Sequence, residues 1–217
     1  MNVINASSST SSTIAAMLLD AQAVRLRPNE PFRWAAGWNS PIYCDNRLTL
    51  SYPSIREAIT LGLHELKNSL FPHTEAVAGV ATAGIPQATL LADASQLPLV
   101  YVRSSSKGHG LQNQIEGRLL QGQKVLMVED LISTGKSSLA AVDAIRAAGA
   151  EVVGMLAIFT YGFADAARAF QTAKVDFATL TNYADLLQVA KERQLITASE
   201  LSTLAEWREN PASWRQS

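Results

Sequence analysis

The stretch that most constrains this chain is residues 124–138, which read KVLMVEDLISTGKSS. It begins with a short uninterrupted apolar run, Val125–Val128, which is typical of a strand buried on both faces of a sheet. Two carboxylates, Glu129 and Asp130, follow this run, and a turn of small residues then leads into a helical pattern. Backbone N–H groups at such a turn can bind a phosphate, while carboxylates can accept hydrogen bonds from vicinal hydroxyls or hold a hard cation. The stretch therefore predicts a site for a phosphorylated sugar.

Two other interpretations of the same stretch carry less weight. The run Gly135-Lys136-Ser137 ends like the phosphate loop of nucleotide triphosphatases, but that motif needs a glycine five residues before Gly135, where this chain has Asp130. An ordinary strand-to-helix turn with an N-cap serine leaves the two adjacent acids unexplained, because desolvating carboxylates is costly.

Composition narrows the class of protein. The 217 residues are 47% hydrophobic, which is enough for one globular domain over residues 1–217 with small additions. The net charge of −1 gives no basic excess, so we expect no nucleic-acid partner and no anionic membrane surface. The single cysteine, Cys44, excludes an intrachain disulfide and fits a reducing cytoplasm. The longest nearly apolar run, residues 152–163, is too short to span a bilayer, and residues 2–13 lack the positive charge of an export signal.

Apolar strands that alternate with helical patterns predict a parallel sheet covered by helices on both faces. The aromatic, turn-rich segment 31–50 has no helical period, and we expect it to form a hairpin or short strands outside the main sheet. We expect strands at residues 76–80, 97–102, 125–128, 152–160 and 177–180, and helices at residues 13–24, 53–68, 87–95, 137–148, 164–172, 184–193 and 198–208.

Ligands of open α/β sheets bind beyond the carboxyl ends of the strands. After Val80, the small residues 81–84 offer exposed N–H groups suited to a second anion such as pyrophosphate, although taken alone this pattern is more often a plain tight turn. After Val102, residues 103–116 form a long polar stretch that carries three basic side chains, Arg103, Lys107 and His109. A loop of this length is usually a lid or a disordered surface segment, and cations on a lid can neutralise a leaving anion.

The run VLMVEDLISTGKSS closely resembles the phosphoribosyl diphosphate (PRPP) signature of type I phosphoribosyltransferases. This resemblance implies their α/β fold, in which Glu129 and Asp130 bind the ribose hydroxyls and the turn binds the 5-phosphate. It also implies Mg²⁺, held through PRPP near the two acids. The residues that it places at PRPP are Arg103, Lys107, His109, Glu129, Asp130, Leu131, Ile132, Ser133, Thr134, Gly135, Lys136, Ser137, Thr82 and Ala83.

Two further segments are similar to one branch of that family, the orotate phosphoribosyltransferases. Arg103, Lys107 and His109-Gly110 match the catalytic loop of these enzymes, and the segment from Phe32 to Tyr43 matches the hood over their base. The chain departs from the pattern at Ala35, Ala83 and Ser104, where basic residues are usual, and residues 157–163 lack the arginine that holds the orotate carboxylate in some members.

The resemblance implies transfer of the 5-phosphoribosyl group of PRPP to orotate, which gives orotidine 5′-monophosphate and pyrophosphate in pyrimidine (UMP) biosynthesis. It makes Lys107, His109 and Asp130 the expected catalytic residues and puts Ser133 and Tyr43 at the orotate. It also implies a cis peptide bond between Ala81 and Thr82, and a homodimer in which the loop of one chain serves the other chain's site. A purine phosphoribosyltransferase and a non-catalytic PRPP-sensing regulator remain alternatives.

Overall fold

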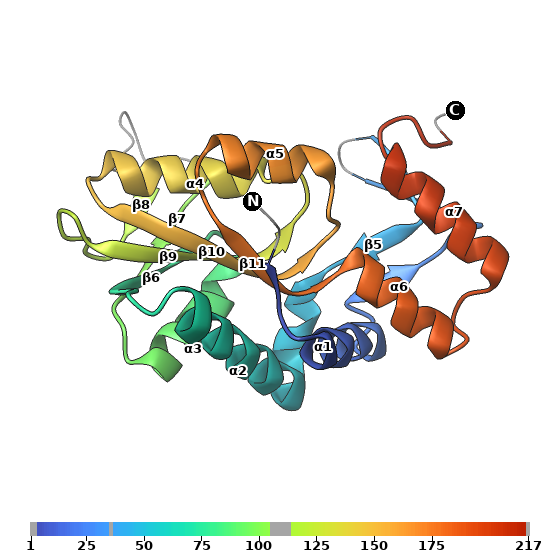
Figure 1. Ribbon diagram of the computed structural model, residues 1–217, viewed down its shortest axis with the longest axis horizontal. Helices are drawn as coiled ribbons and strands as arrows, with labels where there is room; N and C mark the ends of the chain where they lie inside the picture. Colours follow the sequence, from blue (N-terminus) through green and yellow to red (C-terminus); the bar gives the residue numbers. More distant parts are fainter. Residues whose placement is uncertain (1–3, 35–36, 105–113, 216–217) are drawn as a thin grey trace.

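The computed structural model describes residues 4–34, 37–104 and 114–215. Its centre is a seven-stranded sheet with the strand order β1-β11-β10-β9-β6-β7-β8 (Figure 1). All neighbouring strands run parallel except β8, which is antiparallel to β7. The strands are β1 (Ile4–Asn5), β6 (Ala76–Val80), β7 (Leu99–Val102), β8 (Ile115–Glu116), β9 (Lys124–Ile132), β10 (Glu151–Thr160) and β11 (Phe177–Asn182).

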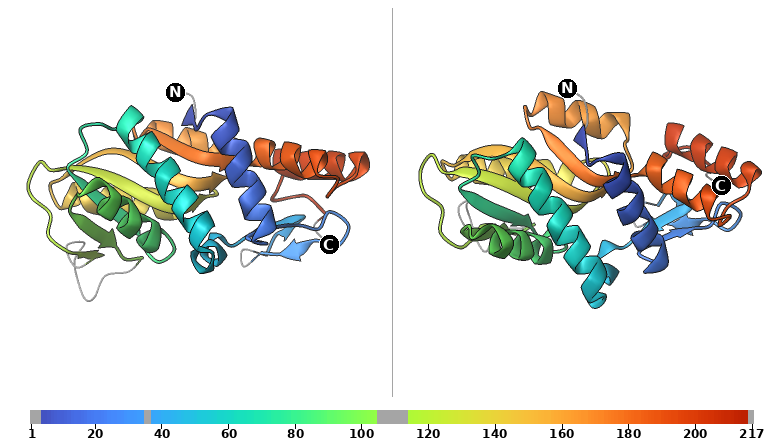
Figure 2. Two further views of the ribbon diagram at one scale, coloured as in Figure 1. Left: turned by 90° about the horizontal axis from the view of Figure 1, so that it is seen from below. Right: turned by 60° about the horizontal axis from the view of Figure 1, so that its bottom comes forward.

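Helices cover both faces of this sheet, as the alternation of strands and helices predicted. In Figure 1 one layer lies below the strands and consists of α1 (Ser8–Asp20), α2 (Pro53–Leu70) and α3 (Gly84–Ser95). The opposite face carries α4 (Lys136–Ala147) and α5 (Ala164–Thr172), and the view from below in Figure 2 has α1 and α2 in front of the strands. The last two helices, α6 (Tyr183–Glu192) and α7 (Ala198–Glu209), lie beyond the end of the sheet.

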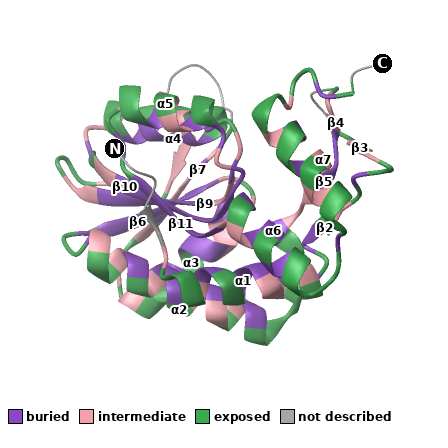
Figure 3. Cartoon of the chain, turned by 45° about the vertical axis from the view of Figure 1, so that its right-hand side comes forward, coloured by how far each residue is buried: buried purple, intermediate pink, exposed green. Residues whose placement is uncertain are grey.

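Strand β9 contributes side chains to two separate cores, one on each face. Leu126 and Val128 pack with the layer of α1, α2 and α3, whereas Val125 and Met127 pack with α4 and α5. All four side chains are fully buried, as the purple strands in Figure 3 illustrate. The uninterrupted apolar run is explained because a strand between two helical layers has no face that meets water. Among the described residues, no helix is long and apolar enough to cross a membrane.

A small β unit lies outside the main sheet, where short strands were expected. Strands β3 (Phe32–Arg33) and β4 (Asn39–Ser40) form one antiparallel pair, and β2 (Val24–Leu26) and β5 (Ile42–Cys44) form another. A short 3-10 helix, Asn46–Ser51, returns the chain to α2. We call residues 24–51 the hood.

Five aromatic rings join the hood to the main sheet and to α7. Trp207 of α7 lies 5.6 to 5.7 Å, between ring centroids, from Trp34 of the hood, from Tyr161 and Phe163 after β10, and from Tyr183 of α6. Trp207 and Tyr161 are almost completely buried. We call these five residues the aromatic cluster. Their large rings contribute most of the apolar area buried at this contact, and this burial accounts for the position of α7 beside the hood.

Several expected boundaries were wrong. The first helix begins at Ser8 and ends at Asp20, because the Ser7 side chain accepts a hydrogen bond from the Thr10 amide and caps it. The strand expected at residues 125–128 continues to Ile132, so Glu129 and Asp130 lie within it. It continues because its end pairs with the end of β10, for example Glu129 with Ala157. The sequence did not predict β1, β2 or the antiparallel β8.

Candidate functional site

A cavity of about 310 Å³ lies at the carboxyl ends of β6 and β9. These strands are parallel neighbours, so the turns that follow them meet at the same edge of the sheet. We call this cavity the acidic pocket. It is lined by Ala81, Thr82, Ala83, Glu129, Asp130, Leu131, Ser133, Thr134, Gly135, Ser137 and Ser138.

One glycine brings the two halves of the acidic pocket together. A Cβ atom added to Gly84 would lie 2.5 Å from the carbonyl oxygen of Val128, so the start of α3 can approach β9 only without a side chain at this position. The contact places the turn after β6 directly beside Glu129. The peptide bond between Ala81 and Thr82 in this turn is cis, which confirms that expectation.

The two acids differ in their surroundings. Glu129 is only 6% exposed and accepts hydrogen bonds from the Asp130 amide (3.1 Å) and the Ser138 hydroxyl (3.3 Å). Burial, and then the charge of Asp130, raise the pKa of Glu129 from 4.5 to about 9. Burial also raises the pKa of Asp130, which is more open to the cavity. A cation bound beside the two acids would favour their charged forms and so oppose both shifts.

The turn between β9 and α4 has backbone and hydroxyl groups suited to an anion. Gly135 has a φ of 78°, and a Cβ atom there would lie 2.7 Å from the Phe170 ring. Both the backbone conformation and the lack of space therefore favour glycine at this position. No side chain of the described residues caps the start of α4, which leaves its first N–H groups free to bind an anion. Ser133, Thr134 and Ser137 add hydroxyl groups to the same cavity.

Not every residue expected at PRPP has its side chain in the acidic pocket. Ile132 is fully buried and packs in the core, so only its backbone can meet a ligand, and Lys136 is exposed and does not line the cavity. Arg103 forms an ion pair with Glu116 (3.6 Å) and is also absent from the lining. Lys107 and His109 lie outside the described residues.

The acids fit a hard cation by the chemistry of their oxygen atoms. Among the described residues, however, no group of three or more His, Cys, Asp or Glu side chains could hold a metal ion by itself. A magnesium ion at Glu129 and Asp130 would therefore take most of its ligands from the substrate and from water, which Mg²⁺ readily keeps.

The hood contacts the acidic pocket through a residue that the sequence did not single out. The Asn46 side chain donates a hydrogen bond to the Asp130 carbonyl oxygen (2.8 Å), and the Cys44 thiol donates one to Asn46 Oδ1 (3.4 Å). Burial, then the charges of Asp130 and Asp45, raise the pKa of the Cys44 thiol. The neighbouring Tyr43 packs on Phe32, with ring centroids 5.5 Å apart. The only signal for Asn46 was its place beside the matched hood segment.

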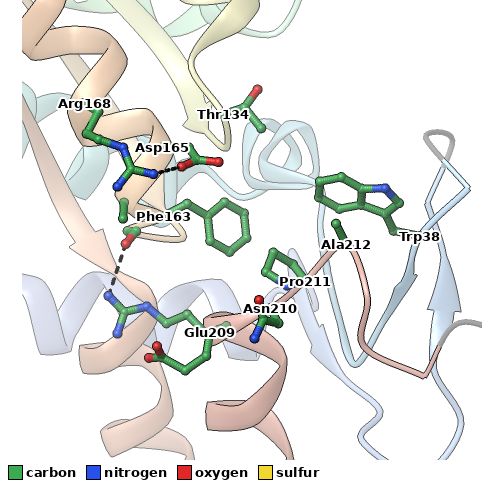
Figure 4. A pocket seen from close by; sticks show the side chains of 12 residues that line it. Trp38, Thr134, Phe163, Asp165, Arg168, Glu209, Asn210, Pro211 and Ala212 are labelled. Atoms are coloured by element: carbon green, nitrogen blue, oxygen red, sulfur yellow. Dashed lines mark hydrogen bonds and ion pairs between the residues drawn. The ribbon is translucent and has the colours of Figure 1, made fainter.

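A second cavity, of about 450 Å³, adjoins the turn that follows β9 (Figure 4). We call it the outer pocket. It shares Thr134 with the acidic pocket and is otherwise lined by Trp38 of the hood, residues 162–165 and 168, and residues 208–212. Trp38 and Phe163 lie on opposite sides of the opening in Figure 4. Sequence reasoning missed this cavity because α7 comes from the far end of the chain.

The raised pKa of Glu129 predicts how its substitution changes stability. The folded protein keeps the Glu129 proton until the pH approaches 9, whereas the unfolded chain releases it above the ordinary pKa of 4.5. Ionisation of the unfolded chain therefore destabilises the fold increasingly between these two pH values. Glu129→Gln carries no charge. We expect its melting temperature to exceed that of the unmodified protein most at about pH 8 and least at about pH 5.

Circular dichroism across this pH range measures the two melting temperatures. The exposed Glu206→Gln serves as the control, because its side chain lies on the surface of α7. A difference for Glu129→Gln that stays constant with pH would contradict the prediction.

Comparisons with known proteins agree with this geometry. The family model of the phosphoribosyl transferase domain matches residues 55–182, which include both turns of the acidic pocket. The chain is 53% identical to an orotate phosphoribosyltransferase of Cytophaga hutchinsonii over 203 residues, which cover 94% of this chain and 97% of that protein. It is 54% identical to one of Bacteroides fragilis over 200 residues, which cover 92% and 94%.

Solved structures show the same fold. The orotate phosphoribosyltransferase of Mycobacterium tuberculosis, in complex with PRPP, superposes with a TM-score of 0.65 and 26% sequence identity. The match covers 82% of this chain and 98% of that one. Because the curated relatives are more than half identical over nearly their whole length, the chain belongs to the orotate phosphoribosyltransferase family.

Proposed function

We propose that this protein transfers the 5-phosphoribosyl group of PRPP to orotate, which gives orotidine 5′-monophosphate and pyrophosphate in pyrimidine biosynthesis. The observation that carries the proposal is the acidic pocket, in which two carboxylates lie between two turns suited to anions. A ribose with phosphate at one end and pyrophosphate at the other has this order of groups. The names of the relatives, which cover nearly the whole chain, support orotate as the acceptor.

In the proposed complex, each part of PRPP has a partner in the pocket. The hydroxyls of the ribose donate to Glu129 and Asp130, the 5-phosphate binds the turn 133–137, and the pyrophosphate lies at the turn 81–83. Glu129 and Asp130 would help to hold Mg²⁺, which would supply positive charge to offset that of the pyrophosphate.

The reaction breaks the bond between the ribose C1 and pyrophosphate and forms a bond from C1 to a ring nitrogen of orotate. Positive charge develops on the ribose as the first bond breaks, and the carboxylate of Asp130 stabilises it in a partly dry pocket. Ser133 and the hood residue Tyr43 are proposed to contact the base. Lys107, His109 and Arg103 are proposed to neutralise the leaving pyrophosphate.

The decisive test is an assay of purified protein with PRPP, Mg²⁺ and a panel of free bases, in which pyrophosphate release is measured. We expect turnover with orotate and none with adenine, guanine or hypoxanthine. Turnover with a purine alone would reassign the substrate, and no turnover with any base would exclude the enzyme.

The pocket predicts that Asp130 matters more for the reaction than Lys136 does. Asp130 lines the cavity, whereas the side chain of Lys136 is exposed beside backbone groups that can already hold the phosphate. We expect Asp130→Asn to lower kcat/KM by about 100-fold or more, since removal of a preorganised charge costs about 10²–10³, and Lys136→Ala to lower it far less. A larger loss for Lys136→Ala in the same steady-state assay would reverse these roles.

We further propose a cytoplasmic homodimer in which residues 103–116 of one chain serve the acidic pocket of the other. The support is the family resemblance of this segment. Lys107→Ala and Asp130→Asn homodimers should each be nearly inactive, whereas a mixed dimer contains one site with both residues intact. Equal mixing with free exchange should restore about a quarter of the unmodified activity, because half of the random dimers are mixed and each carries one intact site.

Exchange of subunits must be verified with two differently tagged chains, and each inactive protein mixed with itself is the control. If exchange is complete and no activity returns, each loop serves its own chain.

A further inference from the structure

Orotate carries a carboxylate on its ring, and among the described residues no cationic side chain lines the acidic pocket to meet it. The charged side chains that line this cavity are those of Glu129 and Asp130, which repel an anion. The outer pocket is the adjoining space, since the two cavities share Thr134. The hood reaches both, because Trp38 lines the outer pocket and Asn46 donates to the Asp130 carbonyl. A base joined to a ribose at Asp130 and covered by the hood can direct its carboxylate into the outer pocket.

Two arginines line the outer pocket, and their situations differ. Arg168 pairs with Asp165 on the same helix, and both side chains are more than 70% exposed, so water screens this charge and a carboxylate already neutralises it. Arg208 is half-buried, and among the described residues no carboxylate forms an ion pair with it.

Arg208 is held at the carboxyl end of β10 by two backbone oxygens. Its Nε donates to the Tyr161 carbonyl and its Nη2 to the Gly162 carbonyl, each at 3.2 Å. These contacts orient the guanidinium without cancelling its charge. An arginine has five N–H groups, so the remaining ones, including both on Nη1, are free for a ligand.

The surrounding structure fixes this arrangement. Trp207, the residue before Arg208, is fully buried in the aromatic cluster, which sets the position of the last turn of α7. Gly162 has a φ of 68°, and a Cβ atom there would lie 3.0 Å from Arg208 Nη2. The glycine therefore leaves room for the guanidinium to reach the strand end.

We propose that Arg208 binds the carboxylate of the orotate ring and so selects this base over ones that lack the group. The inference rests on the proposed function. It places the specificity-determining charge on α7, outside the sheet and the hood. A charge-assisted pair between a planar guanidinium and a carboxylate gives both the affinity and the geometry that such a choice needs.

Two nucleotides test the proposal, because orotidine and uridine 5′-monophosphate differ only in this carboxylate. Calorimetric titration would measure the affinity of each for the unmodified protein and for Arg208→Gln. We expect Arg208→Gln to lower the affinity for orotidine 5′-monophosphate about tenfold or more, whereas the affinity for uridine 5′-monophosphate should change by less than about twofold. Arg208→Lys should keep part of the preference because it keeps the charge.

The matched control is Arg193→Gln, which removes a partly exposed arginine whose partner is Asp20. It should change neither affinity. The proposal is overturned if Arg208→Gln lowers the affinity for both nucleotides equally, which is the result expected of a purely structural role at the end of β10. It is also overturned if the selective loss of affinity occurs in Arg168→Gln instead. If Arg208→Gln does not fold, Arg208→Lys decides by the same comparison, and an unchanged ratio of the two affinities overturns the proposal.

The proposed function can fail separately from this inference. Absence of turnover with orotate in the unmodified protein would remove the function itself. Normal turnover, together with an unchanged nucleotide preference in Arg208→Gln, would remove only the role of Arg208.

Discussion

The pairing of β9 with a parallel strand on each side is the constraint on which the site depends. Its neighbours β6 and β10 hold the backbone of β9 in register, and pairing with β10 extends through Ile132. The ladder therefore carries Glu129 and Asp130 to the sheet edge as part of a strand rather than on a loop. A rigid element positions functional groups more accurately than a loop does. The acidic pocket is completed by turns that lie against this edge. Gly84 allows the turn after β6 to approach β9 closely, because it has no side chain.

The burial of Glu129 shows that the fold bears a cost at its site. A carboxylate inside a sheet loses hydration, and its two hydrogen bonds, from the Asp130 amide and the Ser138 hydroxyl, do not restore the ordinary pKa. Groups of this kind are typical of places where binding, rather than stability, determines the residue. The apolar side chains of β9 just before it, from Val125 to Val128, supply the compensating burial in two cores.

What could be predicted from the sequence was mostly local. The apolar run Val125–Val128, the acids after it and the turn at Gly135 are neighbours along the chain, and their pattern already indicated a strand, a phosphate site and a helix. Asn46 and Arg208 could not be found in this way, because their roles arise from contacts with Asp130 and with the end of β10, far away in the sequence. The two-residue β1 was missed for the same reason, since its only signal is its pairing with β11.

The two cavities also differ in the sequence separation between the segments that form them. The acidic pocket uses residues 81–138, and its strands and turns follow one another along the chain. The outer pocket needs the hood beside the final residues, where Arg215 Nη1 donates to the Pro28 carbonyl (3.0 Å) across a separation of 187 positions. Closing so large a loop costs more chain entropy, so such contacts form late in folding. The proposed phosphate site can thus form before the proposed base-selecting side of the outer pocket is complete.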